Sequence, residues 1–113
     1  MGEDVAALPE PPYWAVIFTS IRHDPRAGDG YEETAARMLA LAAEQPGYLG
    51  VETAREGVGI TVSYFRDEES IRAWKAHADH VVAQERGRTD WYERYAVRVA
   101  RVERAHTWDR PTS

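Results

Sequence analysis

The sequence predicts one α+β domain in which four antiparallel strands and two helices follow the order βαββαβ. Three observations support this fold class. The chain has 113 residues, of which 43% are hydrophobic, and this is enough for one compact core. Four segments are rich in aromatic and β-branched residues, and two amphipathic segments separate the first from the second and the third from the fourth. We expect the domain over residues 13–104, between a flexible N-terminal arm (residues 1–12) and a polar C-terminal tail (residues 105–113).

The first half of the chain is predicted to form the first strand and the first helix. The arm contains three prolines, which favour an extended chain. The run YWAVIFTSIR predicts a strand over residues 13–22, and this strand ends at the turn-forming segment HDPRAGDG. Asp29 is placed to cap the helix that follows, which ends at the sequence QPG. The residues at helical spacing within it are Tyr31, Ala35, Met38 and Ala42.

The second half is predicted to form a hairpin, a second helix and a last strand. Residues 48–55 and 58–66 are strand-like, and only Glu56 and Gly57 separate them, which predicts an antiparallel hairpin. Asp67 opens an acidic first turn, and an apolar stripe behind it predicts one continuous helix to about Gly87. The stripe consists of Ile71, Trp74, Ala78, Val81 and Val82. The fourth strand is expected over residues 95–104.

This element order is that of the ferredoxin-like fold, in which two helices cover one face of an antiparallel four-stranded sheet. The first strand nevertheless has apolar residues on both sides, with Val16 and Phe18 on one and Ile17 and Ile21 on the other. The uncovered face would expose an apolar patch of several hundred Å², which is rare in monomers. We therefore predict a symmetric homodimer with stacked sheets, each burying roughly 800 Å². The alternative is that the apolar face is closed off within a small barrel or covered by a folded-back tail.

Composition and charge exclude several functions. The chain has no cysteine, so disulfides, a thiolate nucleophile and a cysteine zinc site are excluded. The formal net charge of −5 gives no attraction to nucleic acid. No stretch approaches the roughly 18 apolar residues of a membrane span, and the acidic start lacks the features of a secretory signal. We expect a cytoplasmic protein that binds neither nucleic acid nor a membrane.

Several stretches resemble the antibiotic biosynthesis monooxygenase family. They are YWAVIFTS, QPGYLGVE and WKAHADH, and the pattern GITVSYFRDEESIRAWKAHADH followed by GRTDWYERYAVRVARVER resembles short bacterial members of that family. The resemblance covers residues 13–104. It implies a dimeric α+β barrel with a small-molecule pocket between helices and sheet in each subunit. Some relatives oxidise polyketide phenols with molecular oxygen and no cofactor, and others bind and degrade haem.

The resemblance also implies roles for particular residues. In both groups of relatives a tryptophan on the second helix lines the pocket, and Trp74 matches it. Both groups use an asparagine to hold the substrate oxygen, whereas this sequence contains none. Ser20 and Ser70 offer hydroxyl groups near where such a residue would lie. The histidine that binds haem in relatives is matched by Gln84, so haem binding or degradation is disfavoured.

Two histidines are the candidate catalytic residues besides Trp74. In a continuous helix His77, His80 and Gln84 would lie along one edge, at i, i+3 and i+7, beside Trp74. A neutral imidazole can remove a phenolic or enolic proton, and the resulting anion can reduce oxygen directly, so we expect no cofactor. No metal site is expected, because the spacing of His77 and His80 is not the i, i+4 pair of a zinc helix.

The substrate ring is expected to lie against Trp74 and nearby aromatic residues, with an arginine holding any anionic group. The aromatic candidates are Tyr64, Phe65 and Tyr92, and the arginines are Arg22 and Arg94. Each of these residues also has a purely structural interpretation, with Trp74 in the core and the histidines on a solvated helix edge. The leading hypothesis is a cofactor-independent monooxygenase acting on a small aromatic or quinol-like metabolite. The alternative is a non-catalytic small-molecule-binding dimer of the same fold.

Overall fold

One antiparallel sheet with strand order β2–β3–β1–β4 forms the centre of the fold. The computed structural model describes residues 4–112, apart from the side chain of Ala78. The elements are β1 (Tyr13–Arg22), α1 (Tyr31–Ala42), β2 (Tyr48–Glu56), β3 (Val58–Phe65), α2 (Glu68–Ala76), α3 (Ala78–Arg86), the short π-helical turn η1 (Gly87–Trp91) and β4 (Tyr92–Val102). This order and pairing confirm the predicted ferredoxin-like α+β fold.

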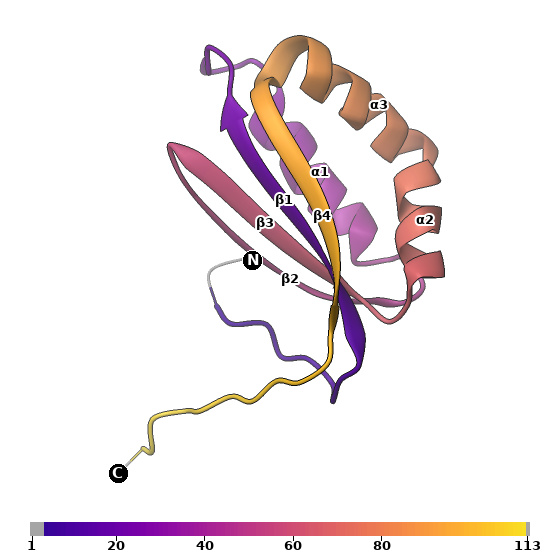
Figure 1. The fold of residues 1–113 in the computed structure, drawn as a ribbon. Coiled ribbons are helices and arrows are strands. Elements are labelled where there is room, and N and C mark those ends of the chain that lie inside the picture. Colours follow the sequence, from indigo (N-terminus) through magenta and orange to yellow (C-terminus); the bar gives the residue numbers. More distant parts are fainter. Residues whose placement is uncertain (1–3, 113) are drawn as a thin grey trace.

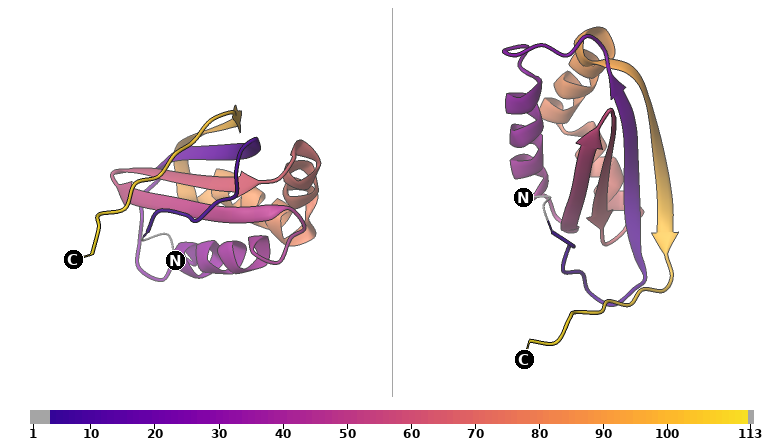
Figure 2. Two further views of the ribbon diagram at one scale, coloured as in Figure 1. Left: turned by 90° about the horizontal axis from the view of Figure 1, so that it is seen from below. Right: turned by 90° about the vertical axis from the view of Figure 1, so that its left-hand side faces the viewer.

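The helices lie together on one side of the sheet, which we call the helix-facing side (Figure 1). Two turned views show α1 beside the strands and the C-terminal tail leading away from them (Figure 2). Val16 of β1 is opposite Ser63 of β3 and Val99 of β4, and it packs against the helical core. Because side chains alternate along a strand, the same side carries Trp14, Phe18, Ser20 and Arg22. We call the opposite side the outer face.

The hydrophobic core lies between the helices and the middle of the sheet. Phe65 of β3 is 1% exposed, and with Ala42 of α1 and Trp74 of α2 it forms the buried cluster. Partly buried residues that pack around the cluster are Val16, Met38, Leu41, Tyr48 and Ile71. The core residues of α1, with Ile71 and Trp74 of α2, therefore pack against the sheet as their spacing predicts, whereas Val81 and Val82 of α3 are 39% and 57% exposed, contrary to that prediction.

The prediction of one continuous second helix is wrong, because the chain leaves the helical conformation at His77. Its ψ of 134° is extended, so α2 ends before it and α3 begins after it. The Nδ1 atom of His77 accepts a hydrogen bond from the backbone N–H of Asp79 at 3.2 Å, which caps the new helix. Three helical segments and the turn η1 therefore stand where two helices were expected.

The outer face of the sheet is partly covered by the N-terminal arm. The backbone N–H of Ala6 donates to the carboxylate of Glu52 at 3.0 Å, and the side chain of Leu8 lies against Gly50. At the same end Tyr13 and Ala15 are buried. The mobility of this arm stays a prediction.

The other end of the outer face is open. Ile21, Val58 and Ile60 are 44%, 49% and 45% exposed there. After Val102 the described part of the C-terminal tail has no regular secondary structure. Within residues 4–112 no helix combines the length and the apolar character that crossing a membrane requires.

Candidate functional site

Trp74 and the two histidines predicted from the sequence do lie together. The ring centroid of His80 lies 4.6 Å from that of Trp74, and the ring centroid of His77 lies 5.5 Å from it. The break at His77 places α3 so that both imidazoles contact one indole. Trp74 is 9% exposed and belongs to the core, as its structural interpretation expects, and its functional role stays a prediction.

The hydrogen bonds of Gln84 fix which nitrogen of His80 carries the proton. The amide nitrogen of Gln84 lies 2.9 Å from the backbone oxygen of Lys75 and 2.9 Å from Nδ1 of His80. The backbone oxygen can only accept, so the Gln84 amide donates to both atoms and Nδ1 of His80 is an acceptor. The neutral ring therefore carries its proton on Nε2.

The burial of His80 favours this neutral form. Burial lowers the pKa of His80 below its ordinary value, and it outweighs the carbonyl oxygen of Lys75, which favours the protonated ring. Nδ1 of His77 is likewise occupied, by the backbone N–H of Asp79. In this geometry the Nδ1 atoms of both rings are engaged within the protein.

The two serines expected to replace the missing asparagine are both engaged within the protein. Ser20 is 2% exposed, and its hydroxyl oxygen accepts a hydrogen bond from the guanidinium of Arg55. The hydroxyl of Ser70 donates to the carboxylate of Asp67 at 2.7 Å, and its backbone N–H donates to the same oxygen at 2.8 Å. Ser70 therefore belongs to the N-terminal cap of α2.

A second group of aromatic rings covers the helix-facing side near the ends of β1 and β4. We call this group the aromatic cluster, and it consists of Phe18, Tyr31, Trp91, Tyr92 and Tyr95. Tyr92 contacts three of the other rings at centroid distances of 5.3 to 5.8 Å. Its hydroxyl donates to that of Tyr31 at 3.2 Å, and burial together with this bond raises the pKa of Tyr92. Of these residues, Tyr92 was a candidate from the sequence.

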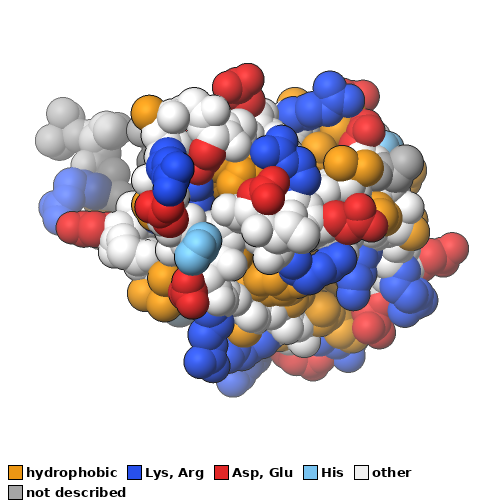
Figure 3. Space-filling model, turned by 90° about the horizontal axis from the view of Figure 1, so that it is seen from above, with side chains coloured by type: hydrophobic (Ala, Val, Ile, Leu, Met, Phe, Trp, Pro, Cys, Tyr) orange, Lys and Arg blue, Asp and Glu red, His pale blue; other side chains and the backbone are white. Residues whose placement is uncertain are grey.

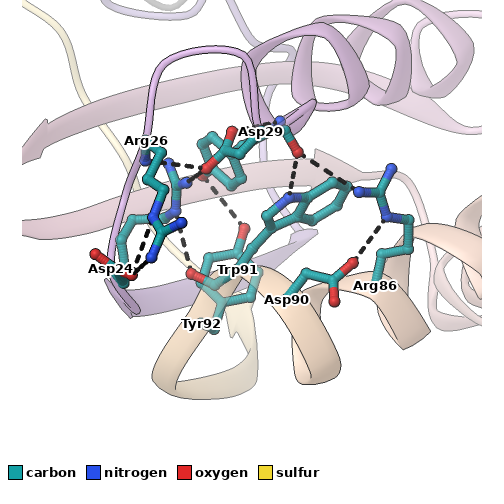
Figure 4. Close-up of polar contacts among 9 residues, drawn as sticks. Asp24, Arg26, Asp29, Arg86, Asp90, Trp91 and Tyr92 are labelled. Carbon is teal, nitrogen blue, oxygen red and sulfur yellow. Dashed lines mark hydrogen bonds and ion pairs between the residues drawn. The ribbon is translucent and has the colours of Figure 1, made fainter.

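Arg22 lies beside the aromatic cluster but is already neutralised. It forms a 2.6 Å ion pair with Asp29, and its side chain is only 12% exposed. Figure 4 shows how Asp29 joins the loop after β1 to the turn η1, because its backbone oxygen accepts from the indole N–H of Trp91 at 3.1 Å. Arg86 adds an ion pair with Asp90. This network fixes the loop after β1 and the turn η1 beside the aromatic cluster.

Two open hollows of about 410 and 340 Å³ flank this loop, but neither is lined by Trp74 or His80. Their walls carry mainly charged side chains, several of them already paired, such as Arg26 with Asp24. Seen from this end, acidic and basic side chains are interspersed over the surface (Figure 3). Such walls do not suit an aromatic ring, so the candidate residues remain the Trp74–His80 pair and, as a separate aromatic surface, the aromatic cluster.

Two of the predicted binding residues lie on the other face of the sheet, and a third is buried in the core. Tyr64 is on the outer face, where its hydroxyl donates to Glu52 at 2.6 Å; burial, and then this contact, raise its pKa. Arg94 is opposite Ile21 and therefore also on the outer face, where it is exposed. Phe65 is on the helix-facing side but lies within the buried core. The structure thus separates Tyr64 and Arg94 from Trp74.

Sequence reasoning missed Arg55, which reaches across the sheet from the edge strand β2. Its register partner in β3 is Gly59, whose own partner in β1 is Ser20. A glycine opposite an arginine signals a place where a long side chain can cross a strand, but the register that reveals it is a property of the folded sheet. Among the described residues, no group of three or more acidic, histidine or cysteine side chains could hold a metal ion.

Comparisons with known proteins agree with this fold. Residues 15–86 match the antibiotic biosynthesis monooxygenase family. The uncharacterised protein YqjZ of Bacillus subtilis is 50% identical over 100% of this chain and 99% of its own length. The jasmonate monooxygenase ABM of Pyricularia oryzae is 33% identical over 79% of this chain, which corresponds to 43% of the fungal protein.

A solved structure shows the same fold at low sequence identity. A variant of SnoaB, a cofactor-independent oxygenase from Streptomyces nogalater, superposes with a TM-score of 0.69 at 16% identity, over 82% of this chain and 95% of that one. The family match spans more than half of the present chain, and the Bacillus relative matches it throughout. The chain belongs to the antibiotic biosynthesis monooxygenase family.

Proposed function

We propose that the protein is a cofactor-independent monooxygenase that oxidises a small aromatic or quinol-like metabolite on the helix-facing side of the sheet. The observation that carries this proposal is the contact of a partly buried His80, whose pKa is lowered by burial, with Trp74, at a ring-centroid distance of 4.6 Å, in a chain of this family. An indole face and an imidazole N–H side by side suit a flat ring that bears an oxygen. Two relatives named as oxygenases, from Pyricularia and Streptomyces, add support.

The reaction balances with oxygen as the only co-substrate. In an anthrone-type substrate, a CH₂ group beside an enolisable ring is converted to C=O, one atom of O₂ enters the product and the other leaves as water. The electron-rich species that reacts with oxygen is the enolate or phenolate, so the protein must favour the deprotonated substrate. N–H groups aimed at the anionic oxygen do this by stabilising its charge.

His80 is the residue to which we assign this role. Because Gln84 occupies Nδ1, the neutral ring donates from Nε2, and such a donor replaces one function of the asparagine found in relatives. A general base at His80 would first have to release the Gln84 amide. Trp74 supplies the wall against which the substrate ring packs. His77, whose Nδ1 caps α3, holds the turn that brings His80 to Trp74.

Oxygen consumption with a panel of anthrones and hydroquinones tests the proposal. Wild type is expected to consume oxygen with at least one of them, His80→Gln to retain part of the rate through its amide donor, and His80→Ala to lose about a hundredfold, as removal of one oxyanion donor does. His106→Ala, in the exposed C-terminal tail, is the matched control and should equal wild type. Turnover undiminished in His80→Ala would remove this residue from the mechanism.

A second candidate function is a non-catalytic binding protein that retains the fold. It is favoured by the absence of asparagine together with the engagement of both candidate hydroxyls, Ser20 by Arg55 and Ser70 by Asp67. A binder would raise its melting temperature with an aromatic ligand, because ligands that bind only the native state stabilise it, yet consume no oxygen. Product formation with the same ligand would decide for the enzyme.

We also infer that two copies associate through the open end of the outer face. Ile21, Val58 and Ile60 are each more than 40% exposed there, and stacking two sheets would bury them. Light scattering is expected to give the mass of two chains, and Ile60→Glu to shift it toward one. Val82→Glu, at a residue of α3 that is 57% exposed, is the matched control and should leave the mass unchanged. A monomeric wild type at micromolar concentration would contradict the inference.

A further inference from the structure

The side chain of Arg55 lies across the helix-facing side of the sheet, above a residue that has no side chain. A Cβ atom built on Gly59 would stand only 2.2 Å from the Cζ atom of Arg55, so the guanidinium occupies the space that any other residue would fill. Beyond Gly59 it donates a hydrogen bond to the buried hydroxyl of Ser20. The long side chain is therefore held at its far end.

This guanidinium has no acidic partner among the residues that the structure describes. Three arginines border the aromatic cluster. Arg22 and Arg86 form ion pairs with aspartates, whereas Arg55 forms none within residues 4–112. Arg55 nevertheless stays accessible to solvent. Its only described hydrogen-bond partner is the neutral hydroxyl of Ser20, so most of its five N–H donors remain available to a ligand.

Aromatic surface lies directly beside this cation. The Cζ atom of Arg55 is 5.9 Å from the ring centroid of Tyr31, and Ser20, to which it bonds, is the register partner of Tyr95. Tyr95 stacks on Phe18 at 5.3 Å and is still 37% exposed. A planar ligand can therefore contact the exposed ring of Tyr95 while a substituent at its edge reaches the guanidinium.

We propose that Arg55 binds an anionic oxygen, either a carboxylate or an ionised phenol, carried by an aromatic ligand that packs on the aromatic cluster. A guanidinium recognises such an oxygen with charge-assisted, often paired hydrogen bonds. Gly59 is the residue that makes the site, because it lets Arg55 lie flat across β3. The proposal rests on the proposed function in one respect, namely that the helix-facing side receives a small aromatic ligand.

Calorimetric binding of three naphthalene probes to the 113-residue chain tests this site without any turnover. The probes are 2-naphthoate, ionised 6-cyano-2-naphthol and the neutral 2-naphthalenemethanol. Wild type is expected to bind at least one anionic probe about tenfold or more tightly than the neutral one, as a hydrogen bond to a charged group allows. A preference for only one of the two anions supports the proposal and identifies the anionic group.

Three variants complete the experiment. Arg55→Gln removes the charge, and Gly59→Ala keeps it but displaces the guanidinium, so both should lose the preference for the anion while still binding the neutral probe. Arg98→Gln removes an equal charge on the outer face, opposite Ile17, and should retain the preference. Far-ultraviolet circular dichroism verifies that each variant is folded.

Other results overturn the site. These are equal affinity of wild type for anionic and neutral probes, no binding of any probe, or a preference retained in Arg55→Gln or Gly59→Ala. Oxygen is not involved in any of these measurements, so a protein that consumes no oxygen can still pass this test. Equal affinity for all probes would remove the anion site and leave the oxygen-consumption experiment to decide the proposed function.

Discussion

Replacing Trp74 by alanine is expected to remove a large part of the stability of the domain. The indole is 9% exposed and is packed against Phe65 and Ala42 in the core. Truncation of a buried tryptophan costs about 3–5 kcal/mol, because apolar contacts are lost and a cavity remains. A domain of this size has only about 5–15 kcal/mol of stability in total. With about 4 °C of melting temperature per kcal/mol, the expected decrease is about 12–20 °C.

Thermal unfolding measures the melting temperature and urea denaturation the free energy of unfolding, both followed by far-ultraviolet circular dichroism, whose signal does not depend on the deleted indole. Trp74→Phe keeps an aromatic ring in the core and should lie between wild type and Trp74→Ala. Trp108→Ala is the matched control, because this tryptophan is 71% exposed in the tail and its loss should cost less than about 0.5 kcal/mol. A cost below about 1 kcal/mol for Trp74→Ala would refute the central position of Trp74 in the core.

Two further predictions concern pH and backbone conformation. Burial lowers the pKa of His80 in the folded protein below the unfolded value of about 6.5, so the stability linked to this residue is present above about pH 6.5 and is lost as pH falls through the lowered value. The urea midpoint of wild type should therefore fall more steeply than that of His80→Gln between about pH 7 and pH 5; parallel curves would contradict this linkage. Gly47 and Gly57 both have a φ of +84°, but a Cβ on Gly47 would lie 2.0 Å from Oγ of Ser70, whereas the space around Gly57 is open. Gly57→Ala should cost about 1–2 kcal/mol for backbone strain alone and Gly47→Ala clearly more, and equal unfolding free energies for the two variants would be inconsistent with the contact at Ser70.

Much of the fold could be predicted because local sequence and global fold agree along most of the chain. The run from Tyr13 to Arg22 combines β-branched and aromatic residues with a turn-forming stop, and it forms β1 with the same bounds. The hairpin at Gly57 and the helix that begins at Tyr31 are equally local signals. Trp74 was identified from the middle of an apolar stripe, and it lies in the core and beside both histidines.

The break at His77 could not be predicted from periodicity, because the apolar stripe continues on both sides of it. The break depends on a cap that His77 supplies to the backbone of Asp79, and on the Gln84 amide that bridges back to Lys75 across the break. The sequence predicted His80 at the edge of one helix. His80 does lie beside Trp74 as expected, but it belongs to a separate helix whose direction the break at His77 sets.

The anion site was missed for a different reason. Arg55 belongs to an ordinary-looking strand, and its importance comes from two residues on other strands, Gly59 and Ser20, that share its register. Tyr64 and Phe65 show another reason why a site residue can be misplaced. Because they are adjacent in a strand, their side chains must face opposite sides of the sheet. The sequence does not say which of the two sides the helices cover.

The most direct test of the helix-facing site is a nuclear magnetic resonance titration of 2-naphthoate that follows the four tryptophan indole N–H signals. Trp74 contacts His80, Trp91 belongs to the aromatic cluster, and Trp108 lies exposed in the tail. The indole signals of Trp74 and Trp91 are expected to shift together and to saturate with one dissociation constant, while that of Trp108 stays in place. A ligand that shifts only Trp108, or leaves Trp74 and Trp91 unmoved at saturation, would contradict the placement of the binding site between the helices and the sheet.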